Sequence, residues 1–310
     1  MRLHEEKEDF RALISIVARE MHLPETAIER DYYIVLLLNN LANSEFKEQC
    51  VFKGGTSLSK CYPGSIERFS EDIDLTFLGM DLSDKVCDKT IKQIEKIMTV
   101  EAFTEKIGSE RSARSKSMYV WFEEPENKVK LEIGSSVRPD PYSKRKIKSY
   151  IHEYLEQIGE TEEIKSFELV DVELNVLAIE RTFVDKLMSV KRHAICGTLN
   201  SKVRHIYDVT RLYQLPEIKA FLKNLDELKA IVQLTKTTDE FYLTKRNINE
   251  AYDPKASYEF GKWKECFTAE IKKIYEQLHQ TLLYTDELQK FDEAINTFEE
   301  IDAILKSIDE

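Results

Sequence analysis

Glycine, proline and cysteine are all scarce in this chain of 310 residues, which contains 9 glycines, 7 prolines and 5 cysteines. So few turn-forming residues favour a helix-rich protein with few tight turns. The cysteines are scattered and odd in number, with no Cys-x-x-Cys pair and no Cys/His metal spacing. A disulfide framework is therefore not indicated, and we expect reduced thiols in a cytosolic protein.

Long apolar runs are also missing, and positive charge is in deficit. The longest apolar run, 32–38, is too short to span a bilayer, and the acidic start of the chain is unlike a signal peptide. The formal net charge is −12 at pH 7. This charge argues against a general nucleic-acid coat protein but leaves room for a local basic groove. We expect a cytoplasmic protein without membrane contacts.

Hydrophobic residues make up 42% of the chain, with 14 tyrosines and 15 phenylalanines, so it can bury a sizeable core in one large or two modest domains. We predict an α/β (α+β) fold, with a small mixed sheet flanked by helices in residues 1–215 and a mostly helical region in 216–310. Strand-like alternation occurs at 73–77, 118–122, 129–133 and 167–177. Helical spacing occurs at 6–21, 26–43, 56–62, 82–100, 178–194, 201–214, 216–233, 238–247, 255–280 and 283–308.

One stretch of the sequence carries recognisable chemistry. A glycine pair, Gly54-Gly55, opens a short polar turn before a predicted helix, and Asp72 and Asp74 then alternate with apolar residues on a predicted strand. Side chains at i and i+2 of a strand share a face, so the two carboxylates form a hard-oxygen site suited to Mg²⁺. Glycine lets backbone N–H groups approach phosphate oxygens, and a helix start favours an anion. The predicted nucleotide cradle consists of Lys53, Gly54, Gly55, Thr56, Ser57, Arg68 and Ser70.

Each part of this pattern is weak when taken alone. A lone Asp-x-Asp is common on exposed strands, and Gly-Gly is usually a turn. Here both occur in order, with Arg68 and Ser70 directly before the carboxylates, which favours the functional interpretation. The spacer between the glycine pair and Asp72 has 16 residues, which predicts an extended loop.

The segments FKGGTSL and RFSEDIDL, with the upstream IERDYYIVLLLNNL, resemble the AbiEii/AbiGii toxin family of the nucleotidyltransferase superfamily. The resemblance covers about residues 26–215. It implies a Mg²⁺-dependent enzyme that transfers a nucleoside monophosphate from an NTP to RNA, with the tRNA 3′ end as the expected acceptor. It also implies a toxin that blocks translation and growth, together with a cognate antitoxin protein.

A third carboxylate is expected on a neighbouring strand, because two carboxylates rarely complete a two-metal site. Glu132 meets this requirement, since Leu131 and Ile133 face the core and Glu132 faces the other way. The predicted metal ligands are Asp72, Asp74 and Glu132. Lys130 shares the face of Glu132 and could neutralise charge there. The alternative is that Glu132 is an ordinary solvated strand residue.

The family resemblance implies two more functional residues, Lys186 in IERTFVDKLMSVKRH and Asp208 in KVRHIYDVTRL. Lys186 would hold the leaving phosphates, and Asp208 would orient Lys186 or position the acceptor hydroxyl. His205 stands where the family has an acidic residue. The alternative makes both residues part of helix surfaces, with Asp208 paired to Arg204 or Arg211. We expect removal of Lys186 to spare the fold in either case.

A basic segment follows the predicted hairpin, with a net charge of +4 over residues 138–148. A polyanion such as tRNA could dock there, although a solvated loop is an equal alternative. Two other functions stay open. One is a transferase of the same fold acting on a small molecule or protein. The other is a non-catalytic nucleotide-binding module, against which the intact Asp72/Asp74 pair argues. The predicted RNA-binding residues are Arg138, Lys144, Arg145, Lys146 and Lys148.

Overall fold

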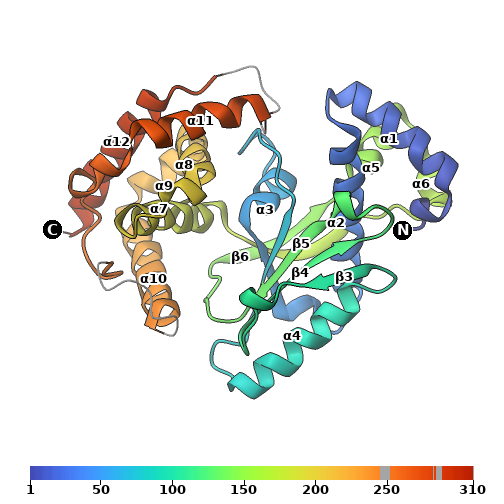
Figure 1. The fold of residues 1–310 in the computed structure, drawn as a ribbon, viewed down its shortest axis with the longest axis horizontal. Helices are drawn as coiled ribbons and strands as arrows, with labels where there is room; N and C mark the ends of the chain where they lie inside the picture. Colours follow the sequence, from blue (N-terminus) through green and yellow to red (C-terminus); the bar gives the residue numbers. More distant parts are fainter. Residues whose placement is uncertain (245–251, 282, 284–287, 310) are drawn as a thin grey trace. The chain divides into compact units, whose positions relative to one another are not determined.

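The computed structural model describes residues 1–244, 252–281, 283 and 288–309, which form two compact units (Figure 1). The first unit comprises Met1–Cys61 and Phe69–Leu177, and the second comprises Tyr62–Arg68 and Ala178–Glu310. The division therefore falls after Leu177. Residue 215, where the sequence predicted a boundary, lies inside the second unit between two consecutive helices.

The first unit is built on a seven-stranded sheet with the strand order β3-β4-β5-β2-β1-β7-β6. The sheet is mixed, because β2 pairs in parallel with β5 and β1 pairs in parallel with β7, whereas the other neighbours are antiparallel. The predicted mixed α/β fold is thereby confirmed. The strands are β1 (Cys50–Lys53), β2 (Asp72–Phe77), β3 (Phe103–Lys106), β4 (Ser115–Trp121), β5 (Val129–Gly134), β6 (Tyr142–Ile147) and β7 (Val172–Leu177).

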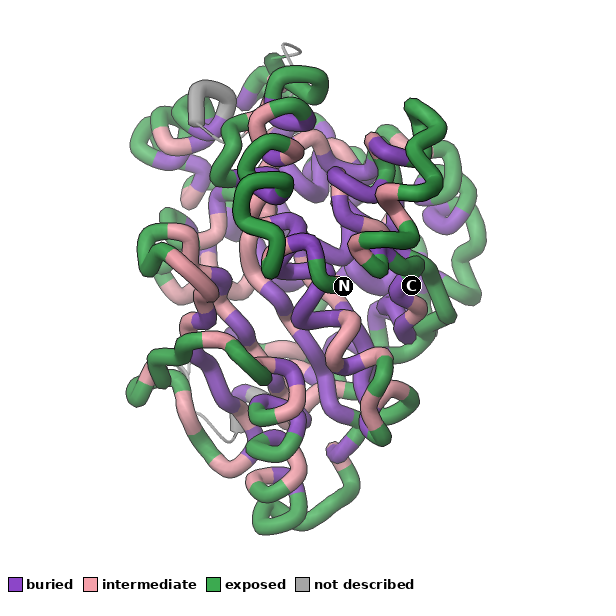
Figure 2. The backbone as a smooth tube through the Cα atoms, turned by 90° about the vertical axis from the view of Figure 1, so that its right-hand side faces the viewer, coloured by how far each residue is buried: buried purple, intermediate pink, exposed green. Residues whose placement is uncertain are grey.

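Helices α2 and α4 pack together and cover one face of the sheet, which receives the apolar residues of β4 and β5. Helix α2 is apolar around most of its circumference and is buried along most of its length, as its continuous apolar run predicts. Figure 2 shows the backbone coloured by burial, with buried residues in purple. The helices of this unit are α1 (Lys7–Met21), α2 (Glu25–Ala42), α3 (Gly54–Cys61), α4 (Asp84–Met98), α5 (Tyr150–Ile158) and α6 (Thr161–Ser166).

The second unit is helical in its described residues. The sequence predicted a continuous helix over 255–280, and this is wrong. Two short 3₁₀ turns, Phe260–Lys262 and Lys264–Cys266, bury Trp263 and Phe267 before α11 begins. Part of the helix predicted over 283–308 lies outside the described residues. The helices are α7 (Ile179–Ile195), α8 (Val203–Gln214), α9 (Pro216–Lys223), α10 (Leu225–Thr244), α11 (Ala269–Thr281) and α12 (Phe291–Asp309).

Candidate active site

The turn between β1 and α3 brings the backbone directly against a carboxylate of β2. Gly54 adopts a φ of +88°, which L side chains rarely adopt. A Cβ atom placed on Gly54 would lie 2.1 Å from Asp74 Oδ2. Any side chain at this position would therefore be strained by the backbone and would collide with the carboxylate. The glycine turn and the predicted metal ligand thus form one local structure.

Hydroxyl groups near the glycine turn hold the start of α3 against the start of β2. Thr56 Oγ1 lies 2.5 Å from the carbonyl oxygen of Asp72 and 3.0 Å from Ser70 Oγ. Ser57 Oγ donates to the carbonyl oxygen of Gly54 at 3.0 Å. Both Thr56 and Ser57 are buried. Their side chains therefore shape the cradle that the sequence assigned to the nucleotide.

The two carboxylates of β2 project from one face of the strand, as the alternation predicts. Asp72 and Asp74 are half-buried, whereas Ile73 between them is fully buried. Register across the sheet then places Asp74 opposite Lys53 of β1 and opposite Glu132 of β5. Carboxylate oxygens gathered in this way fit a hard divalent cation such as Mg²⁺.

Glu132 is paired with a lysine on its own strand. The Lys130 ammonium contacts Glu132 and lies 2.8 Å from Glu110 Oε2. Burial lowers the pKa of Lys130, but the hydrogen bonds that its ammonium donates to Glu110 and Glu132 outweigh burial and raise the pKa above its ordinary value. Lys130 therefore stays charged and neutralises part of the negative charge beside Asp74, which is the role suggested by its place on the strand.

A separate group of potential metal ligands does not coincide with the predicted site. His152, Glu156 and Asp171 place one ligand atom each within 4.8 Å of one another. The Lys148 ammonium, however, lies 2.6 Å from Glu156 Oε2 and 3.4 Å from Asp171 Oδ1. This group already holds a cationic side chain, so the metal prediction rests on Asp72, Asp74 and Glu132.

In the second unit, Asp208 of α8 is fully buried and accepts hydrogen bonds from two cations. Arg68 Nε and Nη2 donate to Asp208 Oδ1 and Oδ2 at 2.6 and 2.8 Å, a bidentate geometry. Lys186 Nζ of α7 lies 2.8 Å from Asp208 Oδ2. Asp208 thus holds the Lys186 ammonium in place, and a catalytic role for the two residues stays a prediction.

The charges in this cluster shift the protonation of its members. Burial alone would raise the pKa of Asp208, but Arg68 and Lys186 lower it further than burial raises it, so the pKa lies well below its usual range. His205, one turn earlier on α8, has a pKa far below its ordinary value because of burial and the nearby Lys186 charge. At neutral pH the cluster therefore contains an ionised Asp208 and a neutral imidazole.

The structure corrects the surface interpretation of these residues. Lys186 is 5% exposed and Asp208 is 0% exposed, so neither lies on a helix surface. Arg211 pairs with Glu67 at 2.6 Å and Arg204 is exposed, so neither takes the place of Arg68 beside Asp208. Arg68, which the sequence assigned to the nucleotide, uses its guanidinium to hold Asp208. The expectation that Lys186 contributes little to the fold is wrong for the same reason.

The predicted RNA-binding residues lie on and around the edge strand β6, and most are matched by carboxylates. Strand alternation separates Lys144 and Lys146 from Arg145, which donates to the carbonyl oxygen of Cys61 at 3.3 Å. The local excess of positive charge is therefore smaller than the sequence of this segment suggests, and RNA binding there stays a prediction. The ion pairs are Arg138–Asp81, Lys144–Glu48, Lys146–Asp171 and Lys148–Glu156.

The sequence analysis missed a buried ion pair beneath α3. Lys60 Nζ lies 2.8 Å from Asp31 Oδ1, and Asp31 Oδ2 accepts the backbone N–H of Tyr150 at 2.6 Å. Burial raises the pKa of Asp31, and Lys60 opposes that rise. The available signal was a carboxylate directly before the apolar run 32–38 of α2, because a charge buried with that run requires a partner.

The structure therefore brings the predicted residues together as two groups. The glycine turn and the carboxylates Asp72, Asp74 and Glu132 belong to the first unit, and Arg68, Lys186 and Asp208 belong to the second.

Among the helices of the described residues, none combines the length and the apolar character that crossing a membrane would require.

A family model for nucleotidyl transferase AbiEii toxins of type IV toxin–antitoxin systems matches residues 36–306. Among solved structures, the chain is similar to MenT4, a nucleotidyltransferase toxin from Mycobacterium tuberculosis H37Rv. The TM-score is 0.50 with 16% identity, over 95% of this chain and 98% of that chain. JHP933 from Helicobacter pylori gives a TM-score of 0.40 with 17% identity, over 83% of this chain and 95% of that chain. No curated protein sequence matches significantly. The likeness to MenT4 supports the fold.

Proposed function

Because the chain belongs to the AbiEii family of nucleotidyltransferase toxins of type IV toxin–antitoxin systems, we propose that it transfers a nucleoside monophosphate from an NTP to an RNA acceptor. The acceptor that we propose is the 3′ end of tRNA, so that the modified tRNA no longer supports translation and growth stops. Membership of a toxin–antitoxin family also implies a cognate antitoxin. We propose a cytoplasmic site of action.

The observation that carries this proposal is the contact between the glycine turn and the second carboxylate. Gly54 can approach Asp74 only because it lacks a side chain, and Gly54 is also the first residue of α3. Backbone N–H groups at a helix start bind phosphate oxygens, and adjacent carboxylates bind Mg²⁺. A nucleoside triphosphate complexed with a divalent cation has the matching chemistry.

In the reaction, a hydroxyl of the acceptor releases its proton to solvent, its oxygen forms a bond to the α-phosphorus, the bond between the α-phosphorus and the bridging oxygen to the β-phosphate breaks, and pyrophosphate leaves. Asp72, Asp74 and Glu132 would hold the metal, which when bound supplies charge stabilisation to the attacking and leaving oxygens. The backbone after Gly54 orients the triphosphate. We propose that Lys186, held by Asp208, binds the phosphate oxygens that become pyrophosphate, and that Arg68 keeps Asp208 in place.

The test is label transfer by the purified protein. Each NTP, labelled at the α-phosphate, is supplied with Mg²⁺ and with total RNA, a panel of small-molecule acceptors or a protein extract. We expect label in the tRNA fraction, and sequencing of RNA 3′ ends should show added nucleotides. Label confined to small molecules or to protein would assign the chain to the alternative transferases. No transfer to any pool would favour a non-catalytic nucleotide-binding module.

Two carboxylate variants sharpen this test. Asp72→Ala and Asp74→Ala should each abolish transfer with little change in melting temperature, because both side chains are half-buried and project from one strand face. Asp81→Ala is the matched control, since the Asp81 side chain is 78% exposed and pairs only with a surface arginine among the ion pairs of the described residues. Full growth inhibition by a folded Asp72→Ala protein would refute the enzymatic toxin.

A further inference from the structure

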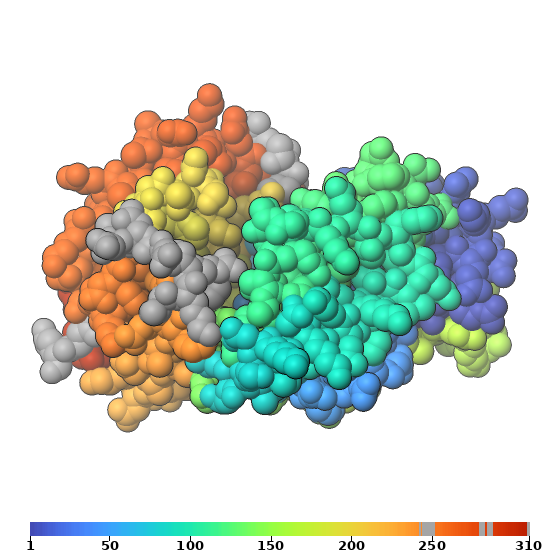
Figure 3. All heavy atoms as spheres, turned by 60° about the horizontal axis from the view of Figure 1, so that its bottom comes forward, coloured from blue at the N-terminus to red at the C-terminus, as the bar shows by residue number. Residues whose placement is uncertain are grey.

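The edge of the sheet that ends in β3 exposes aromatic rings. Phe103 is 61% exposed, the largest exposed fraction for an aromatic residue in the described part of the chain. Its ring stacks on Trp121 of the neighbouring strand β4, with ring centroids 6.0 Å apart and planes inclined by 22°. The segment that carries β3 and β4 lies at the surface in the space-filling view (Figure 3, blue-green). An aromatic pair placed in this way presents a flat apolar surface to solvent.

This aromatic pair lies on the same sheet face as the candidate metal ligands. Strand register pairs Phe103 with Trp121, Tyr119 with Lys130, and Lys130 with Asp72. Side chains in register share a face, and Trp121 is two residues from Tyr119, so both point the same way. Two strand spacings separate β4 from β2, or about 10 Å. The aromatic surface therefore lies on the sheet face of the β2 carboxylates, with Lys130 of β5 between Tyr119 and Asp72.

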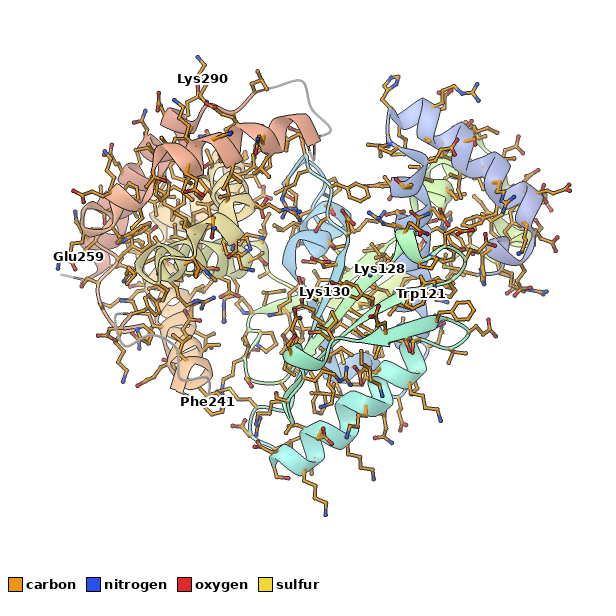
Figure 4. The ribbon with its side chains drawn as sticks, in the orientation of Figure 1. Trp121, Lys128, Lys130, Phe241, Glu259 and Lys290 are labelled. Carbon is orange, nitrogen blue, oxygen red and sulfur yellow. The ribbon has the colours of Figure 1, made fainter. Side chains whose placement is uncertain are left out.

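The charges on this face come from a few lysines that are already engaged. Lys128 Nζ lies 4.1 Å from the centre of the Tyr119 ring, and Lys130 contacts Glu132 and Glu110. Figure 4 labels Lys128 and Lys130 together with Trp121. Glu105 of β3 adds a negative charge. Electrostatic attraction of a polyanion would thus be weak, and the aromatic rings offer the main source of binding energy.

We propose that this surface, formed by Phe103, Trp121, Tyr119 and Lys128 and named here the aromatic edge, binds the unpaired end of the RNA acceptor. Unstacked bases bind to protein aromatic rings in a largely sequence-independent way, and single-stranded ends are the parts of RNA whose bases are free to do so. When a base is stacked on the aromatic edge, only a few nucleotides of RNA need to extend from it for the 3′ end to reach Asp72 and Asp74. The proposal rests on the proposed transfer to RNA and specifies where the acceptor lies.

The test measures binding without NTP or Mg²⁺. A short single-stranded RNA with a free 3′ hydroxyl is titrated into the protein while tryptophan fluorescence is recorded. Of the two tryptophans, Trp263 is buried, so stacking on the aromatic edge should quench Trp121. Phe103→Ala should weaken binding about 5- to 100-fold, whereas Trp121→Phe, which keeps an aromatic face, should bind nearly as wild type in an anisotropy assay. Melting temperatures verify that the variants are folded.

The matched control is Tyr142→Ala, at the opposite edge of the same sheet, where Tyr142 is 38% exposed. It should bind the RNA as wild type does. The salt dependence gives a second criterion, because at most two lysines contribute and the slope of log K against log salt should be no steeper than about −1.4. A much steeper slope, or loss of binding in Tyr142→Ala instead of Phe103→Ala, would overturn the proposal in favour of the basic segment.

Two other outcomes would also overturn it. Equal RNA affinity of wild type and Phe103→Ala would show that the aromatic edge does not bind RNA. Self-association that is lost in Phe103→Ala, with RNA binding unchanged, would assign the surface to a second copy of the chain. If the wild-type protein labels RNA and Phe103→Ala binds and labels it equally well, the aromatic edge fails while the transferase function stands. If the wild type labels no RNA, the proposed function itself fails.

Discussion

Replacing Lys186 with methionine removes an ammonium group 2.8 Å from the buried carboxylate of Asp208. Breaking a buried ion pair costs about 3–5 kcal/mol when a charge is left without a partner. Asp208 keeps its bidentate contact with Arg68 in this variant, so we expect a smaller loss, about 1–3 kcal/mol in the free energy of unfolding. For a unit of this size the loss corresponds to a melting temperature lower by about 3–9 °C.

Asp208→Asn should be more destabilising than Lys186→Met. It leaves two buried cations, Arg68 and Lys186, facing a neutral amide, and the expected cost approaches about 3–5 kcal/mol. Thermal melts followed by circular dichroism at neutral pH should therefore rank wild type above Lys186→Met, and Lys186→Met above Asp208→Asn. Lys229→Met, on the exposed side of α10, is the control for loss of a lysine charge.

Catalysis is measured separately, by single-turnover label transfer at a temperature well below the lowest melting point. A phosphate-directed charge contributes about 2.7–4 kcal/mol to transition-state stabilisation, so Lys186→Met should be slower by about a hundredfold or more. Lys186→Arg should rescue the rate only in part. The double variant with Asp208→Asn should lose less than the sum of the single losses, because the two residues act together.

Two results would refute this reasoning. A melting temperature of Lys186→Met equal to that of wild type would show that the ammonium does not stabilise Asp208. A wild-type transfer rate in folded Lys186→Met would remove Lys186 from the catalytic group, even if the stability ranking holds.

Three further predictions concern the glycine turn, the basic segment and acid stability. Gly54→Ala should abolish transfer, because its Cβ displaces the Asp74 carboxylate. Gly159→Ala, which has a similar φ of +82° and nothing within 4 Å, should cost only about 1–2 kcal/mol of stability and keep full activity; equal transfer rates in the two variants would contradict the steric argument. Charge reversal in the basic segment should weaken the binding of folded tRNA, make its salt dependence shallower and leave NTP binding unchanged. The changes, made together, are Lys144→Glu, Arg145→Glu, Lys146→Glu and Lys148→Glu. An unchanged tRNA affinity and salt slope would mean that the segment is only a solvated surface. The folded-state pKa of His205 is lower than its ordinary value. Below about pH 6.5 the unfolded chain therefore binds a proton at His205 that the folded chain does not bind, so the free energy of unfolding decreases as the pH is lowered. Melting curves at pH 7 and pH 5 should show a smaller decrease for His205→Gln, and an identical decrease would contradict the assignment.

The parts of the site that the sequence predicted depend on local periodicity. Alternation of Asp72 and Asp74 with Ile73 fixes the face on which the carboxylates lie, and the glycine pair marks the turn. The same rule placed Glu132 away from the core. Its register opposite Asp74, however, arises from parallel pairing between β2 and β5, which no periodicity within either segment encodes.

The parts that could not be predicted depend on contacts between distant segments. Arg68 and Asp208 are 140 positions apart, and neither neighbourhood signals the other. The sequence predicted no strand in the basic segment 138–148, because five of the six residues of β6 are polar or charged and lie exposed at the sheet edge. Helical spacing over 255–280 predicted one helix, but in the structure Trp263 and Phe267 are buried beside two short 3₁₀ turns. Tertiary packing decided each of these cases.

The path of the chain through Tyr62–Arg68 explains the long spacer before Asp72. The chain leaves the first unit after α3 and contributes the seven residues Tyr62–Arg68 to the second unit. It returns to the first unit at Phe69, shortly before β2 begins at Asp72. A proteolytic fragment that begins at Ala178 would contain Asp208 and Lys186 but would lack Arg68. Excision at the apparent boundary would thus separate a buried carboxylate from its bidentate partner. The second unit is consequently not an independent cassette that recombination could transfer to another protein intact.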